Sequence, residues 1–176
     1  EKRVYTLVLK GHLCLQNMHF PEGTTGLQLD TAARMSMWRE GYDFGHGTGH
    51  GVGHVLGVHE GPVQIRKNHR GDTVLPIKVG QVITDEPGIY VAGKFGVRIE
   101  NCLLCIEDRQ TEYGKFLKFE PLTLCPYDSS LIDVAMLTEE ERTWLNEYHA
   151  MVCEKLFPLL PNDDEKAWLI RATAKL

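Results

Sequence analysis

Hydrophobic positions along the chain follow two different periods. Apolar residues recur every three or four positions in residues 4–20 and again in residues 27–41, which predicts two helices separated by a turn at Pro21 and Gly23. From residue 42 to about residue 125, short apolar runs lie between glycines and prolines, a pattern typical of strands and turns. The helical period returns in residues 137–160 and in a short last segment, residues 165–174.

This order of elements predicts the fold class. Helices, then strands, then helices indicate an α+β fold with an antiparallel sheet rather than alternating strand and helix units. Thr138 followed three residues later by Glu141 matches a capping box. We therefore expect the first C-terminal helix to begin directly after Thr138.

Composition narrows the class of protein. The chain has 176 residues and is 43% hydrophobic, enough for one domain with a sizeable core. Its formal net charge of −5, with no basic run, favours neither nucleic acid nor an anionic membrane as a partner. No stretch approaches the roughly 18 uncharged apolar residues of a membrane-spanning helix, and the apolar run before Lys10 is too short for a signal peptide. Five cysteines, an odd number, fit free thiols in a reducing compartment, so we expect a cytoplasmic protein.

The stretch GHGTGHGVGH, residues 45–54, is called the histidine segment below, and in it glycine alternates with residues that include His46 and His50. Its five glycines, each costing about 1 kcal/mol relative to alanine, argue against a helix. In an extended chain four residues span roughly 13 Å, so at most one of its histidines can bind a given metal ion. The others would lie beside the bound group and could transfer protons, while the glycines would let another backbone or a ligand approach closely. The alternative is a glycine-rich loop with incidental surface histidines.

Two glutamates lie in the strand-like section VITDEPGIYVAGKFGVRIEN, residues 82–101. A hairpin folded symmetrically about Gly93 would place Glu86 directly across from Glu100, with Cβ atoms about 5 Å apart. Two carboxylates at that distance destabilise a protein unless one is protonated or a cation lies between them. The pair therefore indicates a cation site, and two divalent metals about 3.5–4 Å apart are a common arrangement for hydrolysis. The alternative is a register shift at Pro87 and Gly88 that sends one glutamate to solvent.

Several ordered motifs together resemble a known family. HGTGHGVG, VHEGP, TDEPGIY and VRIEN are similar to the metal-binding half of the creatinase/methionine-aminopeptidase ("pita-bread") metallopeptidases. The resemblance extends from TLVLKGHLCL through LDTAAR to FEPLTLCP and LTEEERTWLNEYH, and it is strongest to the eukaryotic cytosolic aminopeptidase P branch. It implies an incomplete pita-bread fold, with a curved antiparallel sheet flanked by helices. Residues 1–127 would form the C-terminal portion of the catalytic domain, and residues 128–176 a helical extension of it.

The resemblance implies metal ligands. His50 falls on the family's ligand histidine, and Glu86 and Glu100 fall on its two glutamate ligands, whereas His54 matches no ligand. The implied cofactors are two divalent metal ions in the full-length enzyme, most often manganese, with zinc or cobalt as alternatives. The family's two aspartate ligands lie upstream of the segment that matches TLVLKGH, and Asp30 lies at the wrong motif position to replace them. We therefore expect this chain alone to bind at most one metal, weakly, and to be inactive.

Other family positions imply catalytic roles. His46 and His59 fall on the two histidines that contact substrate and help to move protons, and Glu86 is the implied general base. Tyr90 and Arg98 match a pair that lies beside the metals. Arg98 precedes Glu100 by two residues, so it shares the face of that residue and could orient its carboxylate.

These roles imply a function for the full-length protein. A water activated by the metals would hydrolyse the bond between an N-terminal residue and proline, so the substrates would be peptides with proline at the second position. The family also implies a homodimer. Two alternatives stay open: a prolidase-like dipeptidase with the same metal ligands, and a binding module on this fold that has lost catalysis. The presence of His50, Glu86 and Glu100 favours an enzyme.

Overall fold

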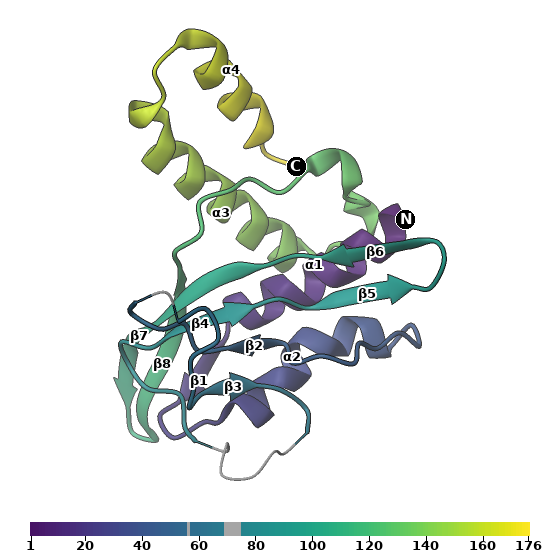
Figure 1. The fold of residues 1–176 in the computed structure, drawn as a ribbon. Coiled ribbons are helices and arrows are strands. Elements are labelled where there is room, and N and C mark those ends of the chain that lie inside the picture. The colour runs from purple at the N-terminus through teal and green to yellow at the C-terminus, as the bar shows by residue number, and fades with distance from the viewer. Residues whose placement is uncertain (56, 69–74) are drawn as a thin grey trace. The chain divides into compact units, whose positions relative to one another are not determined.

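Figure 1 shows the computed structural model of the chain, which describes residues 1–55, 57–68 and 75–176. The chain divides into two compact units. The larger unit contains residues 7–123 and carries all of the predicted site residues, and the smaller unit contains residues 124–176 together with residues 1–6. The predicted α+β class is confirmed, because helices precede and follow a section of antiparallel strands.

Two helices begin the chain close to their predicted positions. Helix α1 spans Lys2–Gln16 and helix α2 spans Gly26–Trp38. The first helix was predicted to continue to residue 20, but His19–Pro21 instead form strand β1, which pairs with strand β8 (Gly114–Pro121). Phe20 is buried in this strand. A short apolar run fits a helix and a strand equally well, which is why the pattern alone placed the end too late.

The main sheet has four antiparallel strands in the order β1, β8, β7, β4. Two further antiparallel pairs are formed by β2 with β3 and by β5 with β6. An isolated bridge between Gly51 and Ile83 joins the segment after β2 to β4. The strands not yet given bounds are β2 (Gly49–His50), β3 (Gln64–Ile65), β4 (Val82–Asp85), β5 (Gly88–Val91), β6 (Phe95–Arg98) and β7 (Asn101–Thr111).

The hairpin predicted around Gly93 is present with the predicted register. Gly93 lies in the turn between β5 and β6 with φ 72°, a conformation that glycine adopts without strain. The ladder pairs Gly88 with Arg98, two positions that are symmetric about Gly93. The register is therefore not shifted at Pro87 and Gly88, although the Glu100 side chain is exposed, as that alternative expected for one of the glutamates.

The same register continues beyond the hairpin into the main sheet. The β4–β7 ladder pairs Asp85 with Asn101, which are again symmetric about Gly93. Glu86 and Glu100 consequently occupy facing positions between the two ladders.

One hydrophobic core joins α1, α2 and the sheet of the larger unit. The helices supply residues such as Leu15 and Leu29, and the sheet supplies residues such as Leu103. Each fully buried side chain of this kind contributes about 1.5–3 kcal/mol relative to an exposed one. The buried members of this core are Leu15, Phe20, Leu29, Ala33, Val63, Ile65, Ile77, Ile83, Leu103, Cys105, Leu117 and Phe119.

The smaller unit is mainly helical, and the two helices predicted from the periodicity of residues 137–160 and 165–174 are present in it. Helix α3 spans Glu139–Leu156 and begins at the predicted capping box. The Glu141 N–H donates to Thr138 Oγ1 (3.2 Å), and the Thr138 N–H donates to Glu141 Oε2 (2.8 Å). Helix α4 spans Asp163–Ala172. The short 3₁₀ helices of the unit are η1 (Ser129–Leu131), η2 (Val134–Met136) and η3 (Phe157–Leu159).

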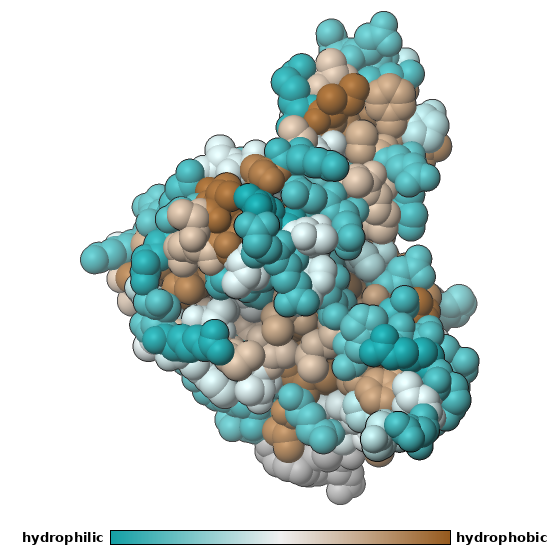
Figure 2. All heavy atoms as spheres, turned by 180° about the vertical axis from the view of Figure 1, so that it is seen from behind, coloured by the Kyte–Doolittle hydropathy of each residue, from teal (hydrophilic) through white to brown (hydrophobic). Residues whose placement is uncertain are grey.

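The surface is mixed in character. Hydrophilic residues cover most of the face shown in Figure 2, and hydrophobic residues form separate groups on it. In the described parts of the chain, none of the helices is both long enough and apolar enough to cross a membrane.

Candidate active site

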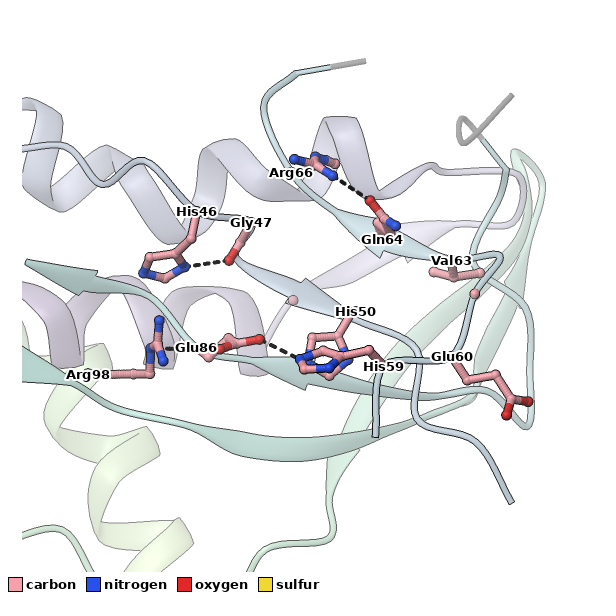
Figure 3. A pocket seen from close by; sticks show the side chains of 12 residues that line it. His46, Gly47, His50, His59, Glu60, Val63, Gln64, Arg66, Glu86 and Arg98 are labelled. Atoms are coloured by element: carbon pink, nitrogen blue, oxygen red, sulfur yellow. Dashed lines mark hydrogen bonds and ion pairs between the residues drawn. The ribbon is translucent and has the colours of Figure 1, made fainter. Parts of the chain in front are cut away.

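Residues of the histidine segment line a cavity of about 350 Å³ together with Glu86 and Arg98, which lie on the two strands that flank the Gly93 turn (Figure 3). It lies within the larger unit. Three separate parts of the chain contribute to it, which are residues 46–50, residues 59–66, and the two hairpin residues Glu86 and Arg98. The lining residues are His46, Gly47, Gly49, His50, His59, Glu60, Gly61, Val63, Gln64, Arg66, Glu86 and Arg98.

His50 and Glu86 are the two predicted metal ligands that the structure brings into contact. His50 Nε2 lies 3.2 Å from Glu86 Oε1, and these side chains are 18% and 12% exposed. His50 Nδ1 lies 2.9 Å from the carbonyl oxygen of Gly51, so Nδ1 carries the hydrogen of the neutral imidazole. Nε2 then presents its lone pair to Glu86. Two electron-pair donors that face each other in this way fit a cation or a proton between them.

Thr84 ties these two ligands to strand β4. Its hydroxyl oxygen accepts a hydrogen bond from the His50 N–H (3.0 Å) and donates one to Glu86 Oε1 (3.1 Å). Thr84 is buried, so both hydrogen bonds are shielded from water. The hydroxyl therefore fixes the position of His50 relative to Glu86.

His46 lines the same cavity but is directed toward Tyr90. The Tyr90 hydroxyl lies 2.8 Å from His46 Nε2, while His46 Nδ1 lies 2.7 Å from the carbonyl oxygen of Gly47. Arg98 approaches Glu86 from the other side, with 3.7 Å between Nε and Oε2. Its guanidinium carbon lies 5.7 Å from the centre of the Tyr90 ring. Tyr90 and Arg98 thus form a chain of contacts between His46 and Glu86.

The remaining predicted residues differ in their relation to the cavity. The His59 ring lies 4.4 Å from the His50 ring, measured between centroids. His54 lines a neighbouring cavity of about 330 Å³ and does not line the first. Glu100 faces Glu86 by register, but its side chain is exposed and does not line the cavity. Over the described residues, no group of three or more His, Cys, Asp or Glu side chains is close enough together to hold a metal ion.

Comparison with models of known protein families shows which family this sequence matches. The profile of the metallopeptidase family M24 matches residues 1–107, and the C-terminal region of peptidase M24 matches residues 115–176. This chain belongs to metallopeptidase family M24.

Individual M24 relatives carry a consistent name. A "Probable Xaa-Pro aminopeptidase P" from Arthroderma otae is 46% identical over 98% of this chain, and one from Phaeosphaeria nodorum is 47% identical over 99%. The chain spans 28% and 27% of the length of these two proteins. The predicted resemblance to aminopeptidase P is confirmed by these matches.

Solved M24 structures confirm the predicted fold. The X-prolyl aminopeptidase from Caenorhabditis elegans, described as a cytosolic enzyme with a di-nuclear active site, matches 99% of this chain with a TM-score of 0.90 and 43% identity. This chain covers 29% of that protein. A Xaa-Pro dipeptidase from Bacillus anthracis matches 72% of the chain with a TM-score of 0.54 and 37% identity, and 32% of its own length is covered. The larger unit is therefore an incomplete pita-bread fold.

In this M24 chain, helix α2 holds the histidine segment in place. Arg34 is fully buried, and its Nε lies 2.6 Å from Oδ2 of Asp30, one helical turn earlier. Arg34 donates hydrogen bonds to the carbonyl oxygens of Phe44 (2.7 Å) and His46 (2.9 Å). The Thr48 hydroxyl donates to Asp30 Oδ1 (2.6 Å). The buried Asp30–Arg34 pair thus provides hydrogen-bond partners for the segment before and after His46, the first histidine that lines the cavity.

The sequence contained a signal for this ion pair that was not assigned a role. Asp30 and Arg34 lie four residues apart in LDTAAR, the spacing at which side chains of opposite charge meet on a helix. The rejection of Asp30 as a metal ligand is consistent with its contacts, because Arg34 and Thr48 occupy its two carboxylate oxygens.

Asp43 extends the same network toward the surface. It lies 2.7 Å from an Arg34 Nη1 and also contacts Lys67. Burial opposes its charge, but hydrogen bonds from Lys67, Trp38 and Arg34 hold the pKa of Asp43 well below its usual range. Asp43 is therefore ionised at neutral pH.

Two glycines of the histidine segment are required by close contacts with other backbone. A Cβ atom on Gly49 would lie 1.8 Å from the carbonyl oxygen of Thr84, and one on Gly51 would lie 2.2 Å from the carbonyl oxygen of Glu60. The predicted close approach of another backbone is confirmed at these positions. The alternative of a loop with incidental surface histidines is wrong for His50, which is mostly buried.

Asp85 lies directly beside Glu86 and was not assigned a role from the sequence. It is fully buried, and its Oδ2 lies 3.1 Å from Nδ1 of His12. Burial raises the pKa of Asp85, His12 opposes this increase, and the charges of Glu86 and Glu100 add to it. The negative charges of Glu86 and Glu100 thus reach Asp85 on the opposite face of the strands, although Asp85 itself does not line the cavity.

Proposed function

We propose that this chain is the metal-binding part of an aminopeptidase that releases an N-terminal residue preceding proline. The observation that carries the proposal is the 3.2 Å contact between His50 Nε2 and Glu86 Oε1, on a cavity that His46 and His59 also line. The names of the relatives support the substrate class, which is peptides with proline at the second position.

His50 and Glu86 are the residues that would hold a divalent metal, with Glu100 as a further ligand from the facing strand. When bound, divalent metals supply a Lewis acid and an activated water for peptide hydrolysis. Nitrogen and carboxylate donors accept manganese, zinc and cobalt, and the aminopeptidase P resemblance favours manganese. Because only two of these ligands are in contact, we expect the isolated chain to bind at most one metal weakly and to have negligible peptidase activity.

The other cavity residues would handle the substrate and its protons. Glu86 would act as the general base, and the reach of its carboxylate into the cavity beside His50 supports this role. His59 would donate a hydrogen bond to the scissile carbonyl group or deliver a proton to the leaving nitrogen, and His46 would do so when its Nε2 exchanges the Tyr90 hydroxyl for substrate. The Tyr90 hydroxyl at 2.8 Å would keep the His46 ring oriented for this role.

Metal content and peptide cleavage test the proposal together. Intact mass and bound manganese or zinc are measured on the 176-residue chain and on a chain extended upstream to the length of its relatives. We expect the extended chain to hold two metals and to cleave Xaa-Pro-Xaa peptides, and the short chain to do neither. Substantial turnover by the short chain, or two metals bound to it, would contradict the proposal.

A substrate panel separates the alternatives. The extended chain is offered an Xaa-Pro-Xaa tripeptide, an Xaa-Pro dipeptide and a Met-Ala peptide. Cleavage of the tripeptide supports the aminopeptidase, and cleavage of the dipeptide alone would make prolidase activity the answer. Absence of cleavage with metals bound would favour a binding module.

A further inference from the structure

Helix α1 places two polar side chains in the interior of the larger unit. His12 and Gln16 are 0% and 4% exposed and lie four residues apart, so they occupy one face of the helix. Leu9 and Leu13 of the same helix are fully buried. A helix face that packs on a core is ordinarily apolar, and buried polar groups require partners. The partners of His12 and Gln16 therefore indicate why the two residues are polar.

These partners are a facing pair of strand residues. His12 Nδ1 lies 3.1 Å from Asp85 Oδ2, and Asn101 Nδ2 donates a hydrogen bond to Gln16 Oε1 (2.9 Å). Asp85 and Asn101 are directly opposite each other at the last pair of the β4–β7 ladder. One face of α1 thus contacts both strands at the same pair.

That pair lies next to the two glutamates of the proposed metal site. Glu86 directly follows Asp85, and Glu100 directly precedes Asn101. Because neighbouring residues of a strand point to opposite faces, Asp85 is directed to α1 and Glu86 to the cavity. The polar pair of α1 therefore lies on the far side of the sheet from the site.

Regular pairing of the two strands is interrupted where the glutamates lie. The β4–β7 ladder ends at Asp85, and the β5–β6 ladder begins at Gly88. Between the ladders, the described backbone contact is a long hydrogen bond from the Ile99 N–H to the Pro87 carbonyl oxygen (3.4 Å), and proline has no N–H to add another. The separation of the strands at the glutamates is consequently set mainly at the ends of the ladders.

We propose that His12 and Gln16 are positioning residues for the metal site, which rests on the proposed role of Glu86 and Glu100 as ligands. They hold Asp85 and Asn101, and hence the two glutamate-bearing strands, at the spacing that lets both carboxylates reach one metal centre. A buried pair of this kind adds little stability over well-packed apolar residues. Removing one partner alone also destabilises the fold, because the other is left buried without it, so the effect on metal binding is judged against a control variant that is itself less stable.

The test compares metal affinity with stability in a chain extended upstream to the length of the relatives. His12→Leu and Gln16→Met remove the polar contacts with little change in volume, and His12→Asn keeps a donor near the position of Nδ1. Leu9→Ala is the matched control, since it creates a cavity at another fully buried position of the same helix and leaves His12 and Gln16 in place. Manganese affinity is measured by titration calorimetry, and unfolding by urea is measured after chelation.

We expect His12→Leu and Gln16→Met to weaken manganese binding by about ten- to a hundredfold, as for other residues that orient ligands. His12→Asn should recover part of this affinity. Leu9→Ala should lower the urea midpoint and leave the affinity within about twofold of the unmutated chain. The inference is overturned if both polar-to-apolar variants behave like Leu9→Ala.

The outcomes also separate this inference from the proposed function. If both variants lose manganese affinity but the chain cleaves no Xaa-Pro peptide, the positioning role is supported and the aminopeptidase is contradicted. If the chain cleaves Xaa-Pro peptides but its manganese affinity is the same in His12→Leu and Gln16→Met as in the unmutated chain, the aminopeptidase is supported and the positioning role is contradicted. Absence of metal binding by the unmutated extended chain would overturn both.

Discussion

His50 Nε2 and Glu86 Oε1 lie 3.2 Å apart although they come from different parts of the larger unit, strand β2 and the residue after strand β4. The contact of Nδ1 with the Gly51 carbonyl oxygen leaves Nε2 as an acceptor in the neutral ring. Two acceptors at this separation repel each other, and a cation between them would remove the repulsion. This relationship leads directly to the first prediction.

Glu86→Gln should abolish metal binding in the extended chain. The change keeps the size of the side chain but removes the negative charge that faces His50. We expect bound manganese after dialysis to fall to background and kcat/KM for an Xaa-Pro-Xaa peptide to fall more than about a hundredfold. Glu112→Gln is the matched control, because Glu112 is exposed and does not line the cavity. Equal metal content in the two variants would contradict the assignment.

Arg34→Met should destabilise the chain strongly. The guanidinium is fully buried against Asp30, and its removal leaves a buried carboxylate and two backbone carbonyl groups without their donor. Breaking a buried pair in this way costs about 3–5 kcal/mol in the free energy of unfolding, measured by urea denaturation. Arg39→Met, at an exposed position just after α2, should change it by less than about 0.5 kcal/mol. Similar values for the two variants would show that the network does not hold the fold.

Gly49→Ala and Gly45→Ala should have unequal effects within the histidine segment. A Cβ on Gly49 would collide with the Thr84 carbonyl oxygen at 1.8 Å, whereas Gly45 has open space around it. Forcing β2 away from β4 is expected to cost about 1–3 kcal/mol or more, and Gly45→Ala should be nearly neutral. The urea midpoints of the two variants provide the measurement. A neutral Gly49→Ala would mean that the segment can shift away from β4 freely.

Protonation of His149 should lower the free energy of unfolding as the pH falls. This residue of α3 is buried, and its Nε2 accepts a hydrogen bond from the Tyr127 N–H (3.1 Å). Burial lowers the pKa of His149 below its ordinary value of 6.5. The unfolded chain therefore takes up this proton first as the pH falls, so the contribution is complete above about pH 6.5 and is lost below it.

The comparison for this prediction is His149→Gln, which keeps an acceptor but does not titrate. Urea midpoints are measured for both proteins at pH 7.5 and pH 5.5. We expect a larger loss between these pH values in the unmutated chain than in the variant. An equal loss in both would assign the acid sensitivity to other groups.

Local patterns were sufficient for much of the fold and for part of the site. The hairpin register followed from the turn at Gly93, and it placed Glu86 opposite Glu100 correctly. The start of α3 followed from the capping box at Thr138. These features depend on residues within a few positions of one another, which is the range over which turn and cap chemistry acts.

Contacts between distant segments could not be obtained in this way. His12 meets Asp85, and Arg34 meets the backbone around His46, through packing of helices on strands and loops. A polar residue inside a helical pattern shows that a partner must exist, but not which one. Likewise, register established that Glu100 faces Glu86 but not that its side chain would be exposed.

The break between the two ladders has a consequence for how this part of the sequence can change in length. Because Asp85 and Asn101 are held at the base of the hairpin, residues inserted or deleted around Gly93 lengthen or shorten its tip without moving the base. The distance between Glu86 and Glu100 in space therefore does not depend on how many residues separate them in the sequence. An M24 enzyme built on this plan can exchange the tip for one of another size, and so reshape what surrounds the cavity, while its two carboxylates stay where they are.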